Sequence, residues 1–471
     1  MKLSLKTKFA YGVGNLGYAS LAQTVNNFIM FFGTSVLGVS GTLVGLAVAL
    51  STFWDGISDP LIGHISDNFH SKKFGKRIGF MIFGTIGMIV FNILLWSVPN
   101  GLSEGAKFVW LLISLLCLET FCTTFSTPYV ALGIDLAPEY AEQNKLQGFK
   151  TVFFILGMIL PSALMFIFMP SGAGQAQFNQ GGYINIAYVT SGICLLAGAV
   201  SILGTKRAEG RIYQNLRPQK PAENAFRAFF KIFYKFFTVL KKPNFSAIIL
   251  GYSVALISTA FLSSVGLHLF TYGFHFTSFQ IACLMGALFV AAIISQVFWI
   301  YLAGRIDKKP ALLVSLVVVL VGIAFTALTF IVRAHIQTST LFFFVLAGLA
   351  VCGFGTGALY SLPISMYADC VSIERAQSGE NNSGIFSGFM TLAYNISNCL
   401  ALFVVGVLLD LIKFNPAQPV QALVVQNWMG VIVFVGCGLA IFGAFLIFRN
   451  YRLKRSEVLK ARLKQKRHTG V

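Results

Sequence analysis

The sequence predicts an all-α, polytopic membrane protein whose twelve transmembrane helices form two bundles of six. Of its 471 residues, 56% are hydrophobic and 11% are charged, whereas a soluble domain carries about 25% charged residues. Apolar runs of twenty or more residues recur along the chain, which is typical of spanning helices. A membrane β-barrel would instead show alternating segments of roughly ten residues. Basic residues gather in a few loops between the apolar runs.

The apolar runs place six spans in each half of the chain. The first-half spans are expected at residues 9–34, 42–66, 78–98, 107–134, 148–169 and 183–204. The second-half spans are expected at residues 246–272, 278–303, 311–332, 341–368, 384–412 and 425–448. The expected domains are a bundle over 1–204, a linker over 205–242, a second bundle over 243–449 and a basic tail over 450–471.

The distribution of charge predicts which ends of the spans face the cytoplasm. A net charge of +19 would suggest nucleic acid in a soluble protein. Here the Lys and Arg residues lie in the loops after spans two and eight, the linker and the tail, whereas loops 34–41 and 170–182 are uncharged. The positive-inside rule then predicts that both termini are cytoplasmic. We expect a multi-pass protein of the cell (inner or plasma) membrane. Because the basic charge is explained by membrane orientation, we expect no nucleic-acid partner. The alternation of basic and aromatic residues over 226–240 predicts an amphipathic helix on the membrane surface.

Catalytic and structural-metal patterns do not occur in the spans. The eight cysteines form no CxxC pair and no Cys/His cluster with metal spacing, so we expect neither disulfides nor structural zinc. The first span follows a lysine-rich start but is too long for a signal peptide and has no cleavage site, so it is expected to remain uncleaved. An enzyme or a non-transporting receptor is the least favoured class, and no cofactor is expected beyond a coupling ion.

Two aspartates, Asp55 and Asp59, lie inside the second predicted span. Four residues are little more than one helical turn, so both carboxylates share a face. Each acid costs about 2.5–3.5 kcal/mol on insertion scales, and we expect a bound Na⁺ or H⁺ to offset that cost. Ser58 and Thr123 are candidate further oxygens, and Asp55 and Asp59 would be the metal ligands if the ion is Na⁺. A buried ion pair with Lys150 is the alternative.

Other polar residues inside the spans leave two interpretations open. Asn15, Gln23 and Asn27 in the first span either line a substrate cavity or form interhelical hydrogen bonds. Asn395 in span eleven can face the same cavity. Glu119 in span four is either a proton site or a structural acid, and the structural role is slightly favoured.

A weak internal repeat links the two halves. The segment 63–67 ends in Asp67 and precedes a basic loop that contains Arg77, and the segment 304–307 ends in Asp307 before another basic pair. Six plus six spans with such a repeat predict the major facilitator architecture, in which two bundles rock around a midplane site. Asp67, Arg77 and Asp307 are therefore expected to act in gating.

The repeat is asymmetric at the acidic pair. The offset that pairs Asp67 with Asp307 pairs Asp55 and Asp59 with Ser295 and Trp299. The second half therefore lacks the two carboxylates, which indicates that they have a specific role and are not part of the shared scaffold.

Five short motifs carry a resemblance to a known family. They are Tyr11–Gly14, Trp54–Gly63, Pro128–Leu132, Ala368–Val371 and Ser383–Gly388. Over nearly its whole length the chain resembles the glycoside–pentoside–hexuronide:cation symporter family. The resemblance implies that Asp55 and Asp59 match the family's cation-site carboxylates, that Thr123 lies near the cation, and that transport is coupled to Na⁺ or H⁺ by alternating access.

The chain departs from this family at its sugar-binding charges. The departures are Tyr18-Ala19 for a Lys-Asp pair, Ser126 and Val130 for an Asp and a Trp, Lys150 for an Arg, and Asn395 for a Lys. These positions, expected to lie at the substrate site, are therefore mostly uncharged. A monomeric symporter of a sugar or glycoside is the favoured interpretation. An amphipathic or lipid-like substrate is the alternative, which the 47 Phe residues also suggest.

Overall fold

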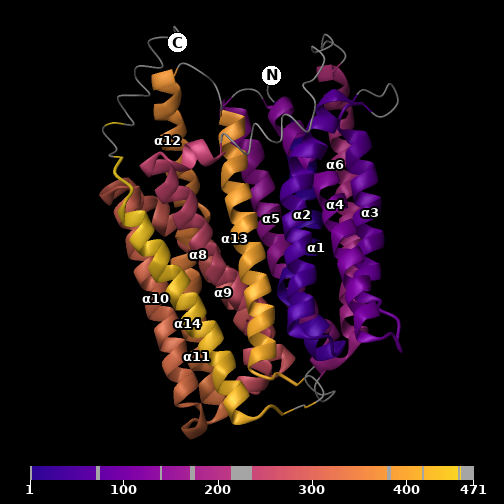
Figure 1. Cartoon of the computed structure of the whole chain (residues 1–471). Coiled ribbons are helices and arrows are strands. Elements are labelled where there is room, and N and C mark those ends of the chain that lie inside the picture. The colour runs from indigo at the N-terminus through magenta and orange to yellow at the C-terminus, as the bar shows by residue number, and fades with distance from the viewer. Residues whose placement is uncertain are drawn as a thin grey trace. The chain divides into compact units, whose positions relative to one another are not determined.

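The computed structural model describes two compact helical units (Figure 1). The described residues are 3–69, 75–137, 140–169, 176–213, 236–378, 383–415, 418, 420–453 and 457. Unit 1 comprises Met1–Phe229, Thr277–Ala282 and Leu402–Pro419, and unit 2 comprises Phe230–Phe276, Cys283–Ala401 and Val420–Val471. Each unit is considered separately below.

Unit 1 contains six long helices. They are α1 (Leu5–Phe31), α2 (Gly41–Asn68), α3 (Ile78–Trp96), α4 (Glu104–Leu136), α5 (Tyr140–Phe168) and α6 (Gln180–Tyr213). Two short elements accompany them, the π-helical turn η1 (Phe32–Val36) and the 3₁₀ turn η2 (Ala176–Phe178). Helix α6 is longer than the span expected at 183–204, so the start of the expected linker is helical.

The helices of the second half lie mainly in unit 2. They are α8 (Pro243–His268), α9 (Ser278–Ile306), α10 (Lys308–Ile331), α11 (Thr338–Thr356), α12 (Leu362–Ser378), α13 (Ser383–Leu411) and α14 (Leu423–Arg449). The short elements are η3 (Leu269–Gly273), η4 (Arg333–His335) and η5 (Gly357–Tyr360). Most of the amphipathic helix expected over 226–240 lies outside the described residues, and residues 236–240 are helical.

Eleven segments of the described chain are long and apolar enough to cross a membrane. One of them, Thr338–Glu374, includes α11, η5 and most of α12. Helix α1 is not among these segments, although its 27 residues extend for about 40 Å and it packs against α5 and α6. Its Lys, Asn and Gln side chains lower its hydropathy. The predicted all-α polytopic architecture is therefore confirmed, with eleven of the twelve predicted spans identified in the described part of the chain.

The internal repeat is visible in how the first helix of each half ends. The N–H of Leu37 donates to the carbonyl of Phe32 at 2.9 Å, and that of Phe274 donates to the carbonyl of Leu269 at 3.0 Å. Each bond closes a π turn, and the residue that follows has a positive φ, Gly38 at 71° and His275 at 57°. The two halves therefore share a local backbone conformation that their side chains do not reveal.

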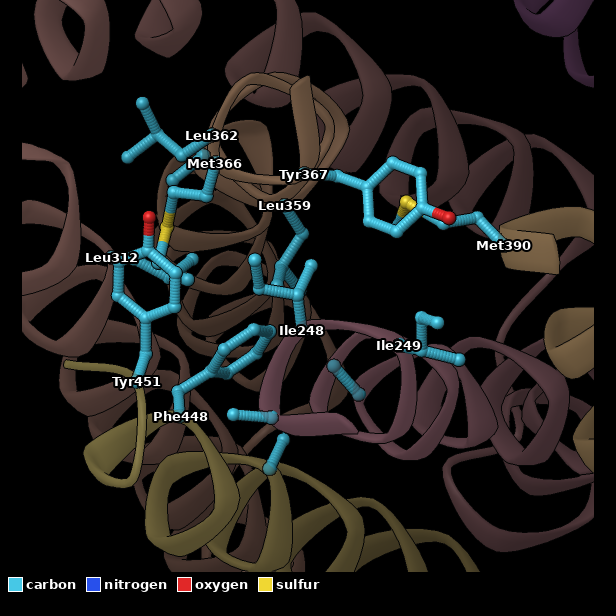
Figure 2. Packing of buried hydrophobic residues seen from close by; sticks show 14 of the residues in the cluster. Ile248, Ile249, Leu312, Leu359, Leu362, Met366, Tyr367, Met390, Phe448 and Tyr451 are labelled. Atoms are coloured by element: carbon cyan, nitrogen blue, oxygen red, sulfur yellow. The ribbon is translucent and has the colours of Figure 1, made fainter. Parts of the chain in front are cut away.

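The core of unit 2 is a continuous cluster of buried apolar side chains. Figure 2 shows Ile248 of α8, Leu359 of η5 and Phe448 of α14 converging within this cluster. Trp299 of α9 is 1% exposed, and its indole N–H donates to the carbonyl of Phe354 at 2.6 Å. Trp299 is thus a packing residue with a satisfied donor.

The start of α2 is fixed by a carboxylate within unit 1. The two oxygens of Asp410 accept from the backbone N–H groups of Gly41 and Thr42 at 2.7 and 2.8 Å. These groups have no partner inside the helix, and the helix dipole favours a negative charge beside them. A Cβ on Gly406 would lie 2.2 Å from the carbonyl oxygen of Gly41, so the two backbones pass in direct contact.

Gly406→Ala should destabilise the protein by about 1–3 kcal/mol, because the added Cβ forces two backbones apart. Gly438→Ala is the matched control, since a Cβ there would meet no atom within 4 Å. The measurement is the melting temperature of the purified protein in detergent. Equal melting temperatures for the two variants would contradict the close approach of the α2 and α13 backbones.

A buried ion cluster joins the start of α1 to the start of α5. The carboxylate of Glu142 lies 2.6 Å from the Lys8 ammonium and 3.2 Å from that of Lys145, and it accepts from the N–H of Leu3 at 3.3 Å. Its side chain is 5% exposed. The hydrogen bond from Lys8, helped by those from Lys145 and Leu3, lowers the pKa of Glu142 to about 2.

Glu142→Gln should lower the melting temperature at neutral pH, because Lys8 then lacks its partner. A lowered carboxyl pKa stabilises the fold above the ordinary value of 4.5, and this stabilisation is lost as the pH falls towards about 2. The difference between wild type and variant should therefore be complete at neutral pH and should narrow below pH 4.5. A difference that stays constant during acidification would contradict the lowered pKa.

Candidate functional site

The acidic pair of α2 faces two hydroxyls of α4. The hydroxyl of Thr123 donates to Oδ1 of Asp55 at 2.9 Å, and that of Thr127 donates to Oδ1 of Asp59 at 3.3 Å. The same spacing of 68 residues separates both pairs, so α2 and α4 run in the same direction and in register. We call Asp55, Ser58, Asp59, Thr123 and Thr127 the α2–α4 polar seam.

Ser58 lies between the two acid–hydroxyl pairs. It is 3% exposed, and its hydroxyl is 3.2 Å from both the carbonyl of Asp55 and the hydroxyl of Thr123. The structure therefore brings Asp55, Ser58, Asp59 and Thr123 together, as expected. Among the described residues, no group of three or more His, Cys, Asp and Glu side chains is arranged to hold a metal ion. A cation in the seam would depend on mixed carboxylate and hydroxyl oxygens.

Three further side chains surround the seam. The indole N–H of Trp54 donates to the hydroxyl of Thr120 at 2.8 Å, which adds a cross-link between α2 and α4. Tyr18 of α1 and Glu119 of α4 lie within electrostatic range of both aspartates. The seam therefore lies where α1, α2 and α4 approach one another.

Lys150 has an aromatic partner. Its ammonium lies 5.7 Å from the ring centroid of Tyr129, a cation–π contact. Tyr129 stacks on Tyr11 with ring centroids 4.4 Å apart, and each phenol donates to the other residue's carbonyl. This buried aromatic pair joins α1 to α4 and places Lys150 against it.

The expected substrate residues of α1 make hydrogen bonds or pack. The side-chain amide of Asn15 donates to the carbonyl of Lys150 at 3.3 Å, and Gln23 donates to Asn27 at 2.6 Å. Ala19 is 1% exposed and packs against Gly157 of α5. For Asn15, this geometry supports the interpretation of an interhelical hydrogen bond.

The remaining substrate candidates differ in exposure. Val130 of α4 is 38% exposed, and Ser126 is half-buried. Asn395 lies in unit 2, on α13, and is 5% exposed. The structure places Ser126 and Val130 on the same helix as Thr123 and Thr127.

The gating candidates of the first half lie at the end of α2 and just before the start of α3. Asp67 belongs to α2, but its side chain lies outside the described residues. Arg77 donates to the hydroxyl of Ser66 at 3.0 Å and lies 3.8 Å from the carboxylate of Asp135. Arg77 therefore joins the end of α2 to the end of α4.

Glu209 is a buried residue that sequence reasoning missed. We expected it in the linker, but it belongs to α6 and is 1% exposed. Its carboxylate accepts from the N–H groups of Lys76, Arg77 and Ile78 at 3.1, 2.7 and 3.3 Å. It thereby caps the start of α3. The only signal in the sequence was an acid among many basic residues.

The corresponding loop of unit 2, between α9 and α10, is held by different contacts. Asp307 has a φ of 81° and caps α10 by accepting from the N–H of Lys308 at 2.7 Å. The ammonium of Lys308 pairs with Asp369 of α12. That of Lys309 donates to the carbonyls of Arg449 and Tyr451 at 2.8 and 2.7 Å.

Thr127 is the other residue that sequence reasoning missed. It follows Thr123 at the same spacing by which Asp59 follows Asp55, so two parallel helices in register would present two matched pairs. The sequence does not show that α2 and α4 are neighbours or that they are in register. Only the packing of these two helices pairs Thr127 with Asp59.

Comparison with known proteins gives relatives that are named as transporters. The chain is 24% identical to an uncharacterized symporter of Synechocystis, over 90% of this chain and 89% of that protein. It is 23% identical to the sodium-dependent lysophosphatidylcholine symporter 1 of Gallus gallus, over 98% and 89%. It is 22% identical to the isoprimeverose transporter of Lactiplantibacillus pentosus, over 92% and 86%.

Solved structures show the same fold. A D-xylose–proton symporter superposes with a TM-score of 0.64 at 12% identity, covering 98% of this chain and 97% of that one. A nucleoside transporter superposes with a TM-score of 0.62 at 12% identity, covering 96% and 100%. The predicted major facilitator fold is therefore confirmed.

The family model for MFS/sugar transport proteins matches residues 10–455. This match includes all of α2 and α4 and therefore the whole polar seam. The chain belongs to the MFS/sugar transport protein family.

Proposed function

We propose that this protein is a secondary symporter in which the α2–α4 polar seam couples solute uptake to the entry of Na⁺ or H⁺. The observation that carries the proposal is that Asp55 and Asp59 each accept a hydrogen bond from a hydroxyl of the neighbouring helix. Each acid costs about 2.5–3.5 kcal/mol to place in a span. A bound cation offsets this cost in the conformation that binds it, and the cost returns in the conformation that does not. Ion binding is therefore linked to conformation.

The donor set suits a small hard cation. Na⁺ binds several oxygens, and a hydroxyl that donates its proton to a carboxylate keeps its lone pairs for a metal ion. Thr123 and Ser58 can therefore add oxygens to those of Asp55 and Asp59. A proton needs a single carboxylate, so the same seam also suits H⁺. Several relatives are named as sodium-dependent symporters, and one structural neighbour is named as a proton symporter.

The resemblance to the glycoside–pentoside–hexuronide:cation symporters supports a sugar or glycoside as the substrate, and one relative is named as an isoprimeverose transporter. The second candidate is an amphipathic or lipid-like substrate. Relatives named as lysophosphatidylcholine symporters match 98% of this chain. The missing sugar-site charges, with Ala19 buried and Val130 exposed on α4, also favour it.

The proposal includes an orientation and a gate. The basic loops and the basic tail support cytoplasmic termini in a plasma or inner membrane. We propose a monomer as the working unit. In this orientation the contacts of Arg77 and the cap formed by Asp307 lie at the cytoplasmic ends of the helices, where we propose that they act with Asp67 in gating. The proposed domains remain two bundles, a linker and a basic tail.

Asp55→Asn and Asp59→Asn should each lower cation-stimulated uptake by about ten-fold or more, because each removes a charged oxygen ligand. Asp55→Glu and Asp59→Glu keep the charge and should retain partial stimulation. The measurement is uptake into proteoliposomes with and without an inward Na⁺ or H⁺ gradient. Full cation-stimulated uptake in both Asn variants would overturn the proposed coupling site.

A thermal-shift screen should separate the two substrate classes. A bound ligand at 100 times its dissociation constant stabilises the folded protein by about 2.7 kcal/mol. We expect a glycoside panel to raise the melting temperature more in Na⁺ than in choline. Stabilisation by lysolipids alone would favour the lipid-like alternative, and equal stabilisation in both salts would argue against sodium coupling.

A further inference from the structure

Two threonines of α4 direct their hydroxyls away from their own helix. A threonine in a helix commonly donates to the carbonyl four residues earlier. Thr120 and Thr124 do so, at 2.7 Å to Leu116 and 2.7 Å to Thr120. Thr123 and Thr127 instead donate across the interface to the aspartates of α2. The difference separates a structural pair of threonines from a pair that serves the seam.

The side chain of Thr127 is held at both of its ends. Its hydroxyl lies 3.3 Å from Oδ1 of Asp59. Its Cγ2 methyl lies 3.3 Å from the point that a Cβ on Gly63 would occupy, one helical turn further along α2. The lack of a side chain at Gly63 lets the methyl approach α2 closely. A β-branched residue with one hydroxyl therefore matches this position in shape and in polarity.

The hydrogen bond from Thr127 has a directional consequence for Asp59. It engages Oδ1 and so restricts the rotation of the Asp59 carboxylate, which Thr123 also approaches within hydrogen-bonding range. Thr123 has the same relation to Asp55 one turn earlier. Two carboxylates on one face of α2 are thus oriented by two hydroxyls on one face of α4, with Ser58 between them.

We propose that Thr127 is a positioning residue for the coupling cation, which orients Asp59 as Thr123 orients Asp55. This inference rests on the proposed function, and it adds a residue that neither the motif on α2 nor the resemblance assigns. Thr127 acts through Asp59 and is not itself required as a ligand. Its loss should weaken cation binding without removing a charge.

Three variants separate the hydroxyl from the methyl. Thr127→Val keeps the shape and the methyl facing Gly63 but removes the donor. Thr127→Ser keeps the donor and removes the methyl. Thr124→Val is the matched control, because Thr124 also lies on α4 but donates to a carbonyl of its own helix.

The first measurement is the infrared carboxyl band of Asp59 in the purified full-length protein, identified by its disappearance in Asp59→Asn. We expect the band to shift in Thr127→Val and to remain near its wild-type position in Thr127→Ser and Thr124→Val. A merely structural role for Thr127 would not move this band. An unchanged band in Thr127→Val would overturn the inference.

The second measurement is the half-saturating cation concentration, from thermal stabilisation by NaCl and, in sodium-free buffer, by acidification. Loss of such an outer contact typically costs about 10–100-fold in metal affinity. We expect a change of that order in Thr127→Val for the cation that stabilises the wild type, and near-wild-type values in Thr127→Ser and Thr124→Val. A wild-type value in Thr127→Val would overturn the inference.

The two proposals fail in different ways. If Asp55→Asn and Asp59→Asn keep the cation response, the proposed coupling site is wrong, whatever the band of Asp59 does. If those variants lose the response while Thr127→Val matches wild type in either measurement, the coupling site stands and only the role of Thr127 is wrong.

Discussion

The desolvation of Asp55 and Asp59 is the constraint on which the arrangement of unit 1 depends. A carboxylate in a spanning helix must find polar partners inside the protein. Here those partners come from α4, which runs in register beside α2 and presents a hydroxyl to each acid. Thr123 also meets Ser58, so that the polar atoms form one connected group. The packing of α2 on α4 is therefore specific in register as well as in contact.

The helix that carries the acids is fixed near both of its ends. Asp410 binds the free N–H groups at its start, and Ser66 near its end accepts from Arg77. Glu209 in turn caps the start of α3 and so fixes the backbone at Arg77. These contacts are made by charged or polar groups on backbone and side-chain partners.

The internal repeat shows which features belong to the scaffold. The π turns that end α1 and α8 recur in both halves. In addition, a basic side chain at the end of the loop after α2, and another at the end of the loop after α9, each pair with an acidic side chain. The positions in unit 2 that correspond to Asp55 and Asp59 are Ser295 and Trp299, which both donate to backbone carbonyls. These two residues serve packing, so the polar seam is an addition to the repeated scaffold in unit 1 alone.

The sequence by itself determined the class of fold, because long apolar runs with few charges are compatible only with membrane-spanning helices. It also singled out Asp55 and Asp59, since an acid in such a run is costly wherever it lies. It did not determine that Thr127 meets Asp59 or that Glu209 is buried. Both depend on which helices are neighbours and on their register, and contacts between residues far apart in the chain are decided only when the helices pack.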